Sequence, residues 1–338
     1  MLQSETGVSG DFGIGVMGVG RYVPKRKITN DQVAEWTGIS VEDILEKTGI
    51  ESRYAIEEDD TASSMAAHAC QDALKSADIE PEQVGLIVGC TSTADYLYPA
   101  MACKVHQILD TKNAYAFDLL ANCTGFQIGL STASAYLTCH PDLEFALVFG
   151  AAVQSPYVKW DDPNDAMFFG DGAGAAVIGR VPSGYGILSD EIITQSASYD
   201  AVRLRGGGSS FPLREDNISD GLQYYDMSGL EVWKQVIQFQ PRTIRRSLEK
   251  IGKTVDDADF FVVHQANLRL IEYLMANMKQ PLSKTFTNVA QIGNTADASL
   301  AITLCDSVHR SLIKRDDLVV LSGVGAGFTF GSSVLRWY

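Results

Sequence analysis

The chain has 338 residues, of which 46% are hydrophobic and 20% are charged, a balance that is typical of folded globular proteins and excludes a disordered chain. Its length predicts one large domain or two fused ones. The formal net charge of -15 excludes nucleic acid as the main partner, because phosphate-backbone binding needs a basic surface, and it disfavours anionic membrane surfaces.

The cysteines and the apolar segments predict a cytoplasmic protein without a metal. The six cysteines form no Cys-x-x-Cys pair, so we expect no zinc or iron–sulfur site. Residues 1–12 lack the charged and apolar regions of a signal peptide. The most apolar stretch, Leu318–Leu335, is interrupted by glycines and predicts two strands joined by a turn instead of a membrane span. We therefore expect a soluble protein of a reducing compartment, the cytoplasm.

Short apolar runs alternate with longer helical patterns along the chain. The runs predict buried strands at Gly13–Val19, Val84–Gly89, Phe145–Phe149, Phe260–Val263 and Leu318–Leu321. The helical patterns lie at Thr61–Ala77, Gly125–Leu137 and Gly229–Ile251. This alternation predicts an α/β protein whose sheets are covered by helices. The glycine-rich segment Arg203–Asn217 predicts an excursion on the surface.

The chain matches itself at about half its length. Three pairs of segments align in order and at nearly the same spacing: Leu74–Cys90 with Leu248–His264, Tyr115–Gly129 with Phe286–Leu300, and Leu147–Gly150 with Val320–Gly323. Each match is weak alone, but three in order predict a duplicated α/β unit. We place the boundary near residue 180, which gives an N-terminal half at 1–180 and a C-terminal half at 181–338.

Cys123 lies where an apolar strand passes into the helical pattern that begins at Gly125. The free N–H groups of a helix N-terminus stabilise a thiolate, so we expect a lowered pKa for this thiol. The other five cysteines lie in helical patterns or at a strand end, where buried structural cysteines are usual. A buried structural role stays open for Cys123 as well.

His264 and Asn294 are the candidate partners of Cys123 in the second half. His264 ends a buried strand at the sheet edge where sites of α/β proteins form, with a core histidine as the alternative. Asn294 is the residue that the gapless alignment pairs with Cys123, so the repeat predicts it at the start of the equivalent helix, pointing to the same place. In isolation Asn294 also fits a helix N-cap.

Two glycine clusters, Phe169–Gly174 and Gly323–Phe328, lack the Lys-Ser/Thr pair of a phosphate-binding loop, and we interpret them as tight turns. N–H groups of the second cluster could form part of an oxyanion hole. A Cys followed by His and Asn leaves two reaction classes. One is a papain-like hydrolase, whose Cys-Gly-Ser/Ala-Cys-Trp/Tyr signature is absent, and the other is an acyl-condensing enzyme.

The chain resembles the β-ketoacyl-acyl carrier protein synthase III branch of the thiolase superfamily. The similarity runs from Gly15–Pro24 to the C-terminal segment that ends at Arg336. Four motifs occur in the family's order and spacing: Ala121–Gly125, Phe169–Gly174, His264–Arg269 and Gly293–Ser299. The resemblance implies an α/β fold of thiolase type, a duplicated five-layer α-β-α-β-α sandwich, and a homodimer. This fold agrees with the internal repeat.

The resemblance also implies a role for each motif residue. Cys123 would take an acyl group from a thioester, and His264 and Asn294 would bind the malonyl thioester carbonyl while carbon dioxide leaves. The backbone N–H groups of Cys123 and Ala326 would form the oxyanion hole when the enolate attacks the acyl group. The expected function is decarboxylative Claisen condensation in fatty-acid-like or polyketide biosynthesis. Its substrates would be acyl and malonyl thioesters of coenzyme A or of carrier phosphopantetheine, with no cofactor.

Two other functions stay open. The first is acyl transfer from a thioester to an alcohol or amine without C–C bond formation, with His264 as general base. The second, from another class, is a catalytically silent partner subunit of a synthase complex. The intact Cys123, His264 and Asn294 argue against the silent subunit.

The chain departs from the family pattern where coenzyme A is held. Lys47 stands in place of an Arg that holds phosphate, and Asp43 in place of a Trp that stacks on adenine. A second Arg of that clamp maps near Pro163, in the acidic stretch Trp160–Asp165. Because an acidic wall disfavours a polyphosphate, we expect the acyl donor to arrive on an acyl carrier protein.

An acidic carrier protein needs a local basic surface. Lys234 and Arg269 fall where the family contacts its carrier protein. Arg242, Arg245, Arg246 and Lys250 have the spacing of one helix face. Either a docking role or a solvated helix face explains that spacing.

The acyl pocket is the part of the site that the resemblance defines least. Tyr98 lies in a loop that, in the family, reaches the pocket of the partner subunit and limits the chain length. Trp233 lies near the expected tunnel mouth. We expect Tyr98 to bound the pocket.

Overall fold

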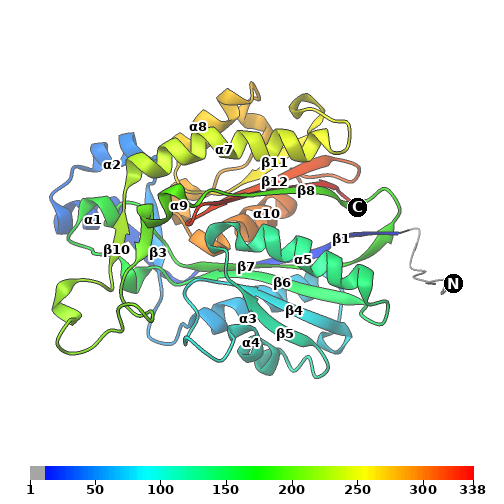
Figure 1. The fold of residues 1–338 in the computed structure, drawn as a ribbon, viewed down its shortest axis with the longest axis horizontal. Helices are drawn as coiled ribbons and strands as arrows, with labels where there is room; N and C mark the ends of the chain where they lie inside the picture. The colour runs from blue at the N-terminus through cyan, green and yellow to red at the C-terminus, as the bar shows by residue number, and fades with distance from the viewer. Residues whose placement is uncertain (1–11) are drawn as a thin grey trace.

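The structure is a computed structural model that describes residues 12–338. The prediction that residues 1–12 form no signal peptide therefore lies almost wholly outside the described residues. Two sheets and three layers of helices are stacked on one another (Figure 1). From one outer face to the other, the layers are α7 (Gly229–Glu249) with α8 (Leu268–Asn277), the four-stranded sheet, α5 (Gly125–Cys139) with α10 (Ser299–His309), the five-stranded sheet, and α3 (Ala62–Ala77) with α4 (Met101–Leu109). The predicted five-layer α-β-α-β-α sandwich is confirmed.

The five-stranded sheet belongs to the first part of the chain and has the order β1-β7-β6-β4-β5. Its strands are β1 (Phe12–Tyr22), β4 (Val84–Cys90), β5 (Tyr115–Leu119), β6 (Phe145–Ala152) and β7 (Gly172–Pro182). β4 runs parallel to β5 and β6, whereas β7 is antiparallel to β6 and to β1. The apolar runs predicted as strands in this part lie within β1, β4 and β6.

The four-stranded sheet belongs to the second part and has the order β11-β12-β13-β8. Its strands are β8 (Gly186–Thr194), β11 (Phe260–Val263), β12 (Leu318–Gly325) and β13 (Thr329–Arg336). β11 runs parallel to β12, and β13 is antiparallel to both β12 and β8. A parallel bridge between Phe261 and Thr285 lies beyond β11, at the place that β5 occupies in the first sheet.

The two sheets are copies of one topology. β8, β13, β12 and β11 take the places of β1, β7, β6 and β4, with the same strand directions. The duplication that the repeat predicts is therefore confirmed. The chain passes from one sheet to the other between Pro182 and Gly186, and we propose this turn as the boundary that the sequence places near residue 180.

Two glycines, one in a strand of each sheet, allow the two halves to approach each other closely. β6 carries Gly150, where an added Cβ would lie 2.2 Å from the carbonyl oxygen of Asp297 in the second half. β12 carries Gly325, where a Cβ would lie 2.5 Å from the carbonyl oxygen of Ala121 in the first half. Only residues without a side chain permit these approaches. Each half thus positions a short helical turn of the other.

The helices follow from their sequence patterns. α3 begins after Thr61, whose hydroxyl accepts a hydrogen bond from the N–H of Ser64 in a capping box. It buries a face of alanine and methionine against the first sheet, whereas α10 is buried on nearly all sides because it lies between the sheets. None of the helices in the described part of the chain combines the length and apolarity that a membrane span requires.

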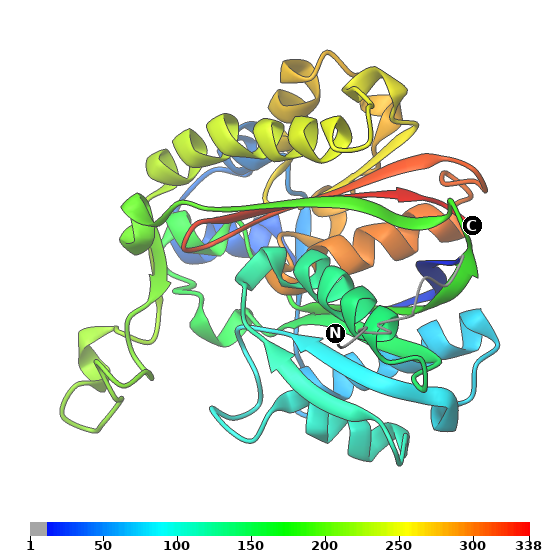
Figure 2. The ribbon, with the colours of Figure 1, turned by 45° about the vertical axis from the view of Figure 1, so that its right-hand side comes forward.

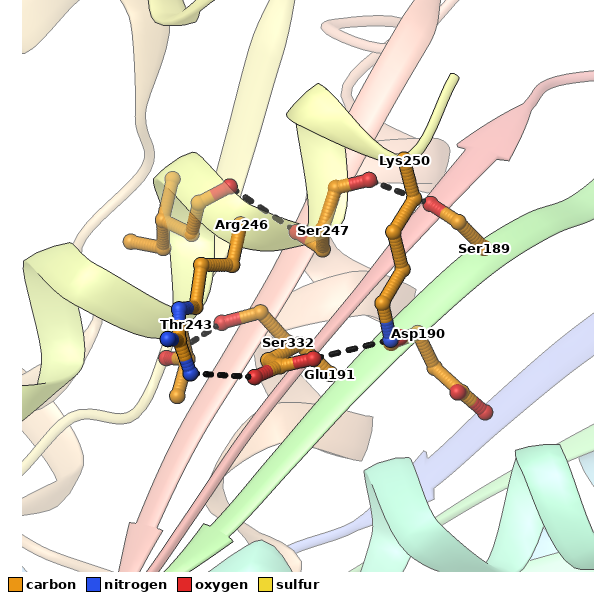
Figure 3. A network of polar contacts seen from close by, with 9 residues as sticks. Ser189, Asp190, Glu191, Thr243, Arg246, Ser247, Lys250 and Ser332 are labelled. Atoms are coloured by element: carbon orange, nitrogen blue, oxygen red, sulfur yellow. Dashed lines mark hydrogen bonds and ion pairs between the residues drawn. The ribbon is translucent and has the colours of Figure 1, made fainter.

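α7 is held on the second sheet by a polar network (Figure 3). Ser189 Oγ on β8 donates to the carbonyl oxygen of Ser247, 2.6 Å away. Glu191 on β8 receives both Arg246 (3.1 Å) and Lys250 (2.8 Å) from α7. The hydrogen bond from Lys250, and then the one from Arg246, holds the pKa of Glu191 below its usual range.

Smaller elements close one end of the molecule. They are β2 (Arg26–Thr29), β3 (Ser52–Ala55), α1 (Asn30–Thr37), α2 (Val41–Thr48), α6 (Pro163–Ala166), α9 (Val289–Ile292), β9 (Val202–Leu204) and β10 (Tyr225–Met227). β9 and β10 pair as a two-stranded sheet at the base of a long excursion (Figure 2). The glycine-rich segment predicted at the surface begins in β9 and projects from the body of the molecule.

Candidate active site

Cys123 lies in a short 3₁₀ helix, η2 (Asn122–Thr124), between β5 and α5. The glycines of β12 let this turn approach, since a Cβ at Gly323 would lie 3.1 Å from Thr124 Cα. Thr124 Oγ1 donates to the carbonyl oxygen of Thr329 at 2.8 Å and fixes the turn on the second half. Cys123 is partly exposed and lines a cavity of about 350 Å³.

The predicted lowering of the Cys123 pKa is wrong for this site. Cys123 does precede α5, as the sequence indicates, and its own backbone N–H favours the thiolate. Although part of the residue reaches the cavity, the protein packed around the thiol keeps water from it, and this desolvation acts in the opposite direction and dominates. The carboxylate of Asp297 adds to it, so the pKa of the Cys123 thiol is raised well above its usual value. The local helix pattern omits both of these effects.

His264 follows β11, and its backbone N–H donates to the carbonyl oxygen of Ser322 at 2.9 Å. Its Nδ1 lies 2.7 Å from Ser299 Oγ, which also accepts a hydrogen bond from the N–H of Gln265 at 2.9 Å. Because that hydroxyl already accepts from Gln265, its proton is available to Nδ1, an arrangement that favours the tautomer with the proton on Nε2. Burial lowers the pKa of His264 to about 4, so the ring is neutral at pH 7.

Asn294 follows α9 and is fixed through its backbone. Its N–H donates to Phe168 O at 2.9 Å and its carbonyl accepts from Gly170 N at 3.0 Å. The side-chain Oδ1 accepts from the N–H of Ala296 at 2.9 Å. The amide therefore has its Nδ2 donors left for a ligand, since no residue between 12 and 338 accepts from them.

The predicted equivalence of Asn294 and Cys123 in the repeat is wrong. α5 begins at Gly125 and α10 at Ser299, and pairing these two helix starts shifts the register of the repeat at this point. η2 then corresponds to η8 (Ala296–Ala298), and Cys123 corresponds to Asp297. Asn294 lies before η8 and not at the start of the helix. The gapless alignment missed this because it matched residue types instead of helix starts.

The site forms where η2 and η8 pack against each other. Cys123 contacts the apolar cluster that contains Ala296 and Ala298. Asn294 and Ser299, the contact of His264, flank η8 on either side. The structure thus brings Asn294, and through Ser299 also His264, to the turn that packs against η2. Of the three predicted catalytic residues, Cys123 lines the cavity of about 350 Å³, whereas His264 lines a separate small pocket.

Ala326, the predicted second donor of the oxyanion hole, lines the same cavity as Cys123. Asn122 Nδ2 donates to the carbonyl oxygen of Ala326 at 3.0 Å and ties the β12–β13 turn to η2. No group of three or more His, Cys, Asp or Glu side chains within residues 12–338 is arranged to hold a metal ion. The chemistry available here is therefore that of a thiol, an imidazole, an amide and backbone donors.

Sequence reasoning missed a buried carboxylate beside the nucleophile. Asp297 is 1% exposed, its Oδ2 accepts from Ser92 Oγ at 2.6 Å, and its Oδ1 has no hydrogen-bond partner among the described residues. Burial raises the pKa of Asp297 to about 6. A single acid inside the stretch of small residues from Gly293 to Ala298 was the signal available in the sequence.

The two residues expected to dock a carrier protein differ in how they are held. Lys234 is exposed and pairs only with Glu231, at 2.7 Å, within the described chain. Arg269 donates to the carbonyl oxygens of Leu45 (2.9 Å) and Glu46 (2.8 Å) and pairs with Glu272. Arg269 therefore also fastens α2 to α8.

The expected basic face of α7 is partly neutralised. Arg242, Arg245 and Arg246 are all exposed. Arg246 is bound to Glu191, as Figure 3 shows, and Arg245 donates to Asn277. Arg242 has no ion-pair partner in the part of the chain that the structure describes. The docking role of this face stays a prediction.

Neither predicted pocket residue lines the cavity within one protomer. Tyr98 is 85% exposed, and Trp233 packs beside Tyr273 with ring centroids 5.6 Å apart. The role expected for Tyr98 involves a partner subunit, so it stays a prediction. The polar part of the cavity wall, which includes Gln154 and Tyr225, was not predicted from the sequence.

The chain is similar to known proteins over both halves. Residues 117–196 match the family described as 3-oxoacyl-[acyl-carrier-protein (ACP)] synthase III, and residues 248–337 match its C-terminal part. A β-ketoacyl-[acyl-carrier-protein] synthase III of Caldanaerobacter subterraneus subsp. tengcongensis is 35% identical over 323 residues, which are 96% of this chain and 97% of the relative.

Two solved structures share the fold. The 3-oxoacyl-[acyl-carrier-protein] synthase III from Aquifex aeolicus has a TM-score of 0.88 at 32% identity and covers 96% of this chain and 100% of its own. The priming β-ketosynthase of the R1128 polyketide biosynthetic pathway has a TM-score of 0.89 at 28% identity and covers 98% of both chains. The matched regions contain the turns that carry Cys123, His264 and Asn294.

Proposed function

Because this chain belongs to the β-ketoacyl-[acyl-carrier-protein] synthase III family, and is thus a condensing acyltransferase, we propose that Cys123, His264 and Asn294 are its catalytic residues. The observation that supports the proposal is the packing of η2, which carries Cys123, against η8, which Asn294 precedes and the His264 contact Ser299 follows. The enzyme acts on acyl and malonyl thioesters and condenses them with loss of carbon dioxide.

In the first half-reaction Cys123 Sγ attacks the carbonyl carbon of an acyl thioester. The C–S bond to the donor breaks, the donor leaves as a thiol with the Cys123 proton, and an acyl–Cys123 thioester remains. Because the pKa of the free thiol is raised, the proton must be transferred as the substrate binds. The N–H groups of Cys123 and Ala326 are the proposed oxyanion donors in this step and the last.

In the second half-reaction the malonyl thioester binds with its carbonyl oxygen between His264 Nε2–H and Asn294 Nδ2. Both groups are neutral donors, since the pKa of His264 is lowered to about 4. As the bond to the carboxylate breaks and carbon dioxide leaves, negative charge develops on this oxygen and the two hydrogen bonds stabilise the enolate. The enolate carbon then attacks the acyl carbonyl and releases the Cys123 thiolate. The reaction needs no metal or other cofactor.

The test joins two measurements. Intact-mass analysis after incubation with acyl thioesters should show the acyl mass on the wild type, and no stable thioester on Cys123→Ser. With a malonyl carrier substrate, the acylated enzyme should release carbon dioxide and form a β-keto product. Acyl transfer to an alcohol or amine without carbon dioxide would overturn the condensation mechanism, and an enzyme that never acylates would be a silent subunit.

We also propose that the acyl donor arrives on a carrier protein. Asp43 forms a hydrogen bond with Ser40 at an exposed helix start, and Asp162 caps α6 beside Pro163, so one position of the expected adenine clamp is negatively charged and the other lies next to a negative charge. Such a surface repels the phosphates of coenzyme A. Acylation rates from acyl-coenzyme A and acyl-carrier protein decide this, and a strong preference for coenzyme A would contradict it.

A homodimer is the proposed assembly. β5 is an edge strand of the first sheet, and the loop after β4 exposes Tyr96, Leu97 and Tyr98 at 73%, 87% and 85%. Open strand edges and clustered apolar side chains are typical of interfaces. Light scattering should give the mass of a dimer, and Leu97→Asp should give a monomer, whereas Leu282→Asp, on another surface, should not.

We further propose a cytoplasmic location. All six cysteines are free thiols, which is typical of reducing compartments. Fractionation of cells should recover the protein with the cytoplasmic carrier proteins, and recovery with the periplasm or membranes would contradict the proposal.

A further inference from the structure

The cavity beside Cys123 is lined by polar side chains, and one of them, Gln154, has an amide without a hydrogen-bond partner in the described chain. From them we propose that the acyl donor of this enzyme is a short acyl group that carries a hydroxyl or an amine, a donor of hydrogen bonds, on its chain. The proposal rests on the function proposed above, in which Cys123 takes the acyl group. The polar side chains that line the cavity include Ser92, Thr93, Gln154 and Tyr225.

The unpaired side-chain amide of Gln154 is the strongest evidence for a polar acyl group. It follows β6, is fully buried and lines the cavity, and neither its Nε2 nor its Oε1 has a hydrogen-bond partner among residues 12–338. Its backbone is held in place, since its N–H donates to Asp171 Oδ1 at 2.6 Å. Burying an unpaired amide destabilises a fold, so a ligand that pairs with both atoms is favoured at this position. A hydroxyl group can donate to Oε1 and accept from Nε2.

Ser92 and Asp297 make this part of the cavity favour a hydrogen-bond donor over a negatively charged group. Ser92 Oγ donates its proton to Asp297 Oδ2, so its lone pairs remain to accept a hydrogen bond in the cavity. Asp297 itself is buried and has one unpaired oxygen. A group that donates, such as an alcohol or an amine, suits this wall. A carboxylate on the acyl chain would be repelled by the carboxylate of Asp297.

Tyr225 supplies a further hydroxyl. Its ring stacks on Phe169 with centroids 4.4 Å apart, and its hydroxyl has no hydrogen-bond partner within residues 12–338. Arg203 is the one cationic side chain among the described residues of the cavity wall, and it is bound by Asp200 and Asp226. The cavity therefore offers uncharged hydrogen-bonding groups and no free positive charge for an acidic chain.

The size of the cavity limits the acyl group. About 350 Å³ is near the lower end of small-molecule pockets. Leu120, Val202 and Leu204 give it an apolar part that packs against methylene groups. A short chain with one polar substituent therefore satisfies both parts of the wall, whereas a plain alkyl chain would leave Gln154 unpaired.

The test measures acylation of Cys123 by thioesters of N-acetylcysteamine, which avoid the choice between coenzyme A and carrier protein. Butyryl, α-hydroxybutyryl, β-hydroxybutyryl, β-aminobutyryl and succinyl thioesters form a matched set, and intact mass follows each rate. At least one hydroxyl or amino substrate should acylate Cys123 about tenfold faster than butyryl, because a site built for a polar group rejects the analogue that lacks it. Between the hydroxyl and amino arms, the faster one identifies the donor.

Two variants and one control test whether Gln154 and Tyr225 cause the preference for polar acyl groups. Gln154→Leu should slow the polar substrates and quicken butyryl, and Tyr225→Phe, which keeps the ring stack, should weaken the preference if Gln154→Leu fails to fold. Gln280→Leu removes a buried amide that is already paired with Asp256, outside the cavity, and should leave the preference unchanged.

Each result has a defined meaning. Fastest acylation by butyryl or succinyl, equal rates across the set, or a preference that survives both Gln154→Leu and Tyr225→Phe would overturn the polar-pocket proposal alone. Failure of every thioester to acylate Cys123 would overturn the proposed function and this proposal together.

Discussion

The hydroxyl of Ser299 lies 2.7 Å from Nδ1 of His264 and accepts the N–H of Gln265 on its other side. Ser299 begins α10, the buried helix between the two sheets. The first residue of this buried helix thus orients the imidazole and favours the proton on Nε2, where a substrate carbonyl needs a donor. Ser299 acts on the substrate only through His264 and is a positioning residue.

Replacing Ser299 by Ala should slow carbon dioxide release from malonyl substrate by roughly tenfold to a hundredfold, because a misplaced donor loses much of its effect. Acylation of Cys123 should change little. The ¹⁵N chemical shifts of His264 should move toward the other tautomer, which a merely structural loss would not cause. Ser307→Ala removes a comparable buried hydroxyl of α10 and should affect neither. Equal loss in both half-reactions would contradict the assigned role.

Alkylation of Cys123 by iodoacetamide should rise about tenfold per pH unit from pH 7 to pH 9, because the raised pKa keeps the thiolate scarce over this whole range. Peptide mass spectrometry can follow Cys123 separately from the exposed Cys103. Asp297→Asn removes the charge that helps to raise this pKa, so alkylation at pH 7 should be faster. A plateau below pH 8 would show that the thiolate is already formed.

Asp297 should make the fold less stable as the pH rises. Its folded pKa of about 6 exceeds the usual 3.8, so its protonated form is favoured by the fold and this stability is lost as the pH rises through 6. The cost at pH 8 is about 3 kcal/mol, from the shift in pKa. Asp297→Asn should therefore raise the free energy of unfolding in urea at pH 8 and bring little gain near pH 4. The exposed Asp59→Asn should show no such difference, and a gain independent of pH would refute the account.

Lys234→Glu should raise KM for a carrier-bound substrate by roughly threefold to tenfold, with a smaller effect at high salt, since charges at an interface rim act mainly on association. Rates with N-acetylcysteamine thioesters should stay the same. Lys75→Glu on α3 is the matched control for net charge. An unchanged KM would remove Lys234 from the docking surface.

Arg269→Glu tests docking less cleanly than Lys234→Glu. Arg269 holds the carbonyl oxygens of Leu45 and Glu46 at the end of α2, so its loss should also lower the melting temperature. Thermal unfolding measured beside KM separates the two effects. If the melting temperature is unchanged while KM rises, the contacts with α2 contribute little and docking alone explains the change.

The most apolar strands and the longest helices were predictable because each of them follows from a local pattern, whereas the short elements such as β2, β3, α1 and α2 were not predicted. The apolar run at Phe260–Val263 predicts β11, and the turn after it brings His264 to the sheet edge. The repeat predicts that both halves build one fold, since their patterns of strand and helix agree when the second half of the chain is laid on the first. These predictions need no knowledge of which segments meet.

The cavity wall was not predictable because it combines segments that meet only in three dimensions. Ser92 follows β4, Gln154 follows β6, and Asp297 lies in η8 of the other half. The raised pKa of Cys123 has the same origin, since it depends on burial and on Asp297 and not on the helix that follows. Local pattern finds the nucleophile, but only the packing of the halves shows its surroundings.

The reciprocal glycine contacts place an unusual limit on how this enzyme can vary. Gly150 and Gly325 touch no substrate in the proposed reaction, yet a single methyl group at either would force apart the turns that carry the nucleophile and Asp297. Most core positions tolerate several hydrophobic side chains of similar volume. Gly150 and Gly325 tolerate no side chain at all, so we expect glycine at both positions in every active homologue of this enzyme.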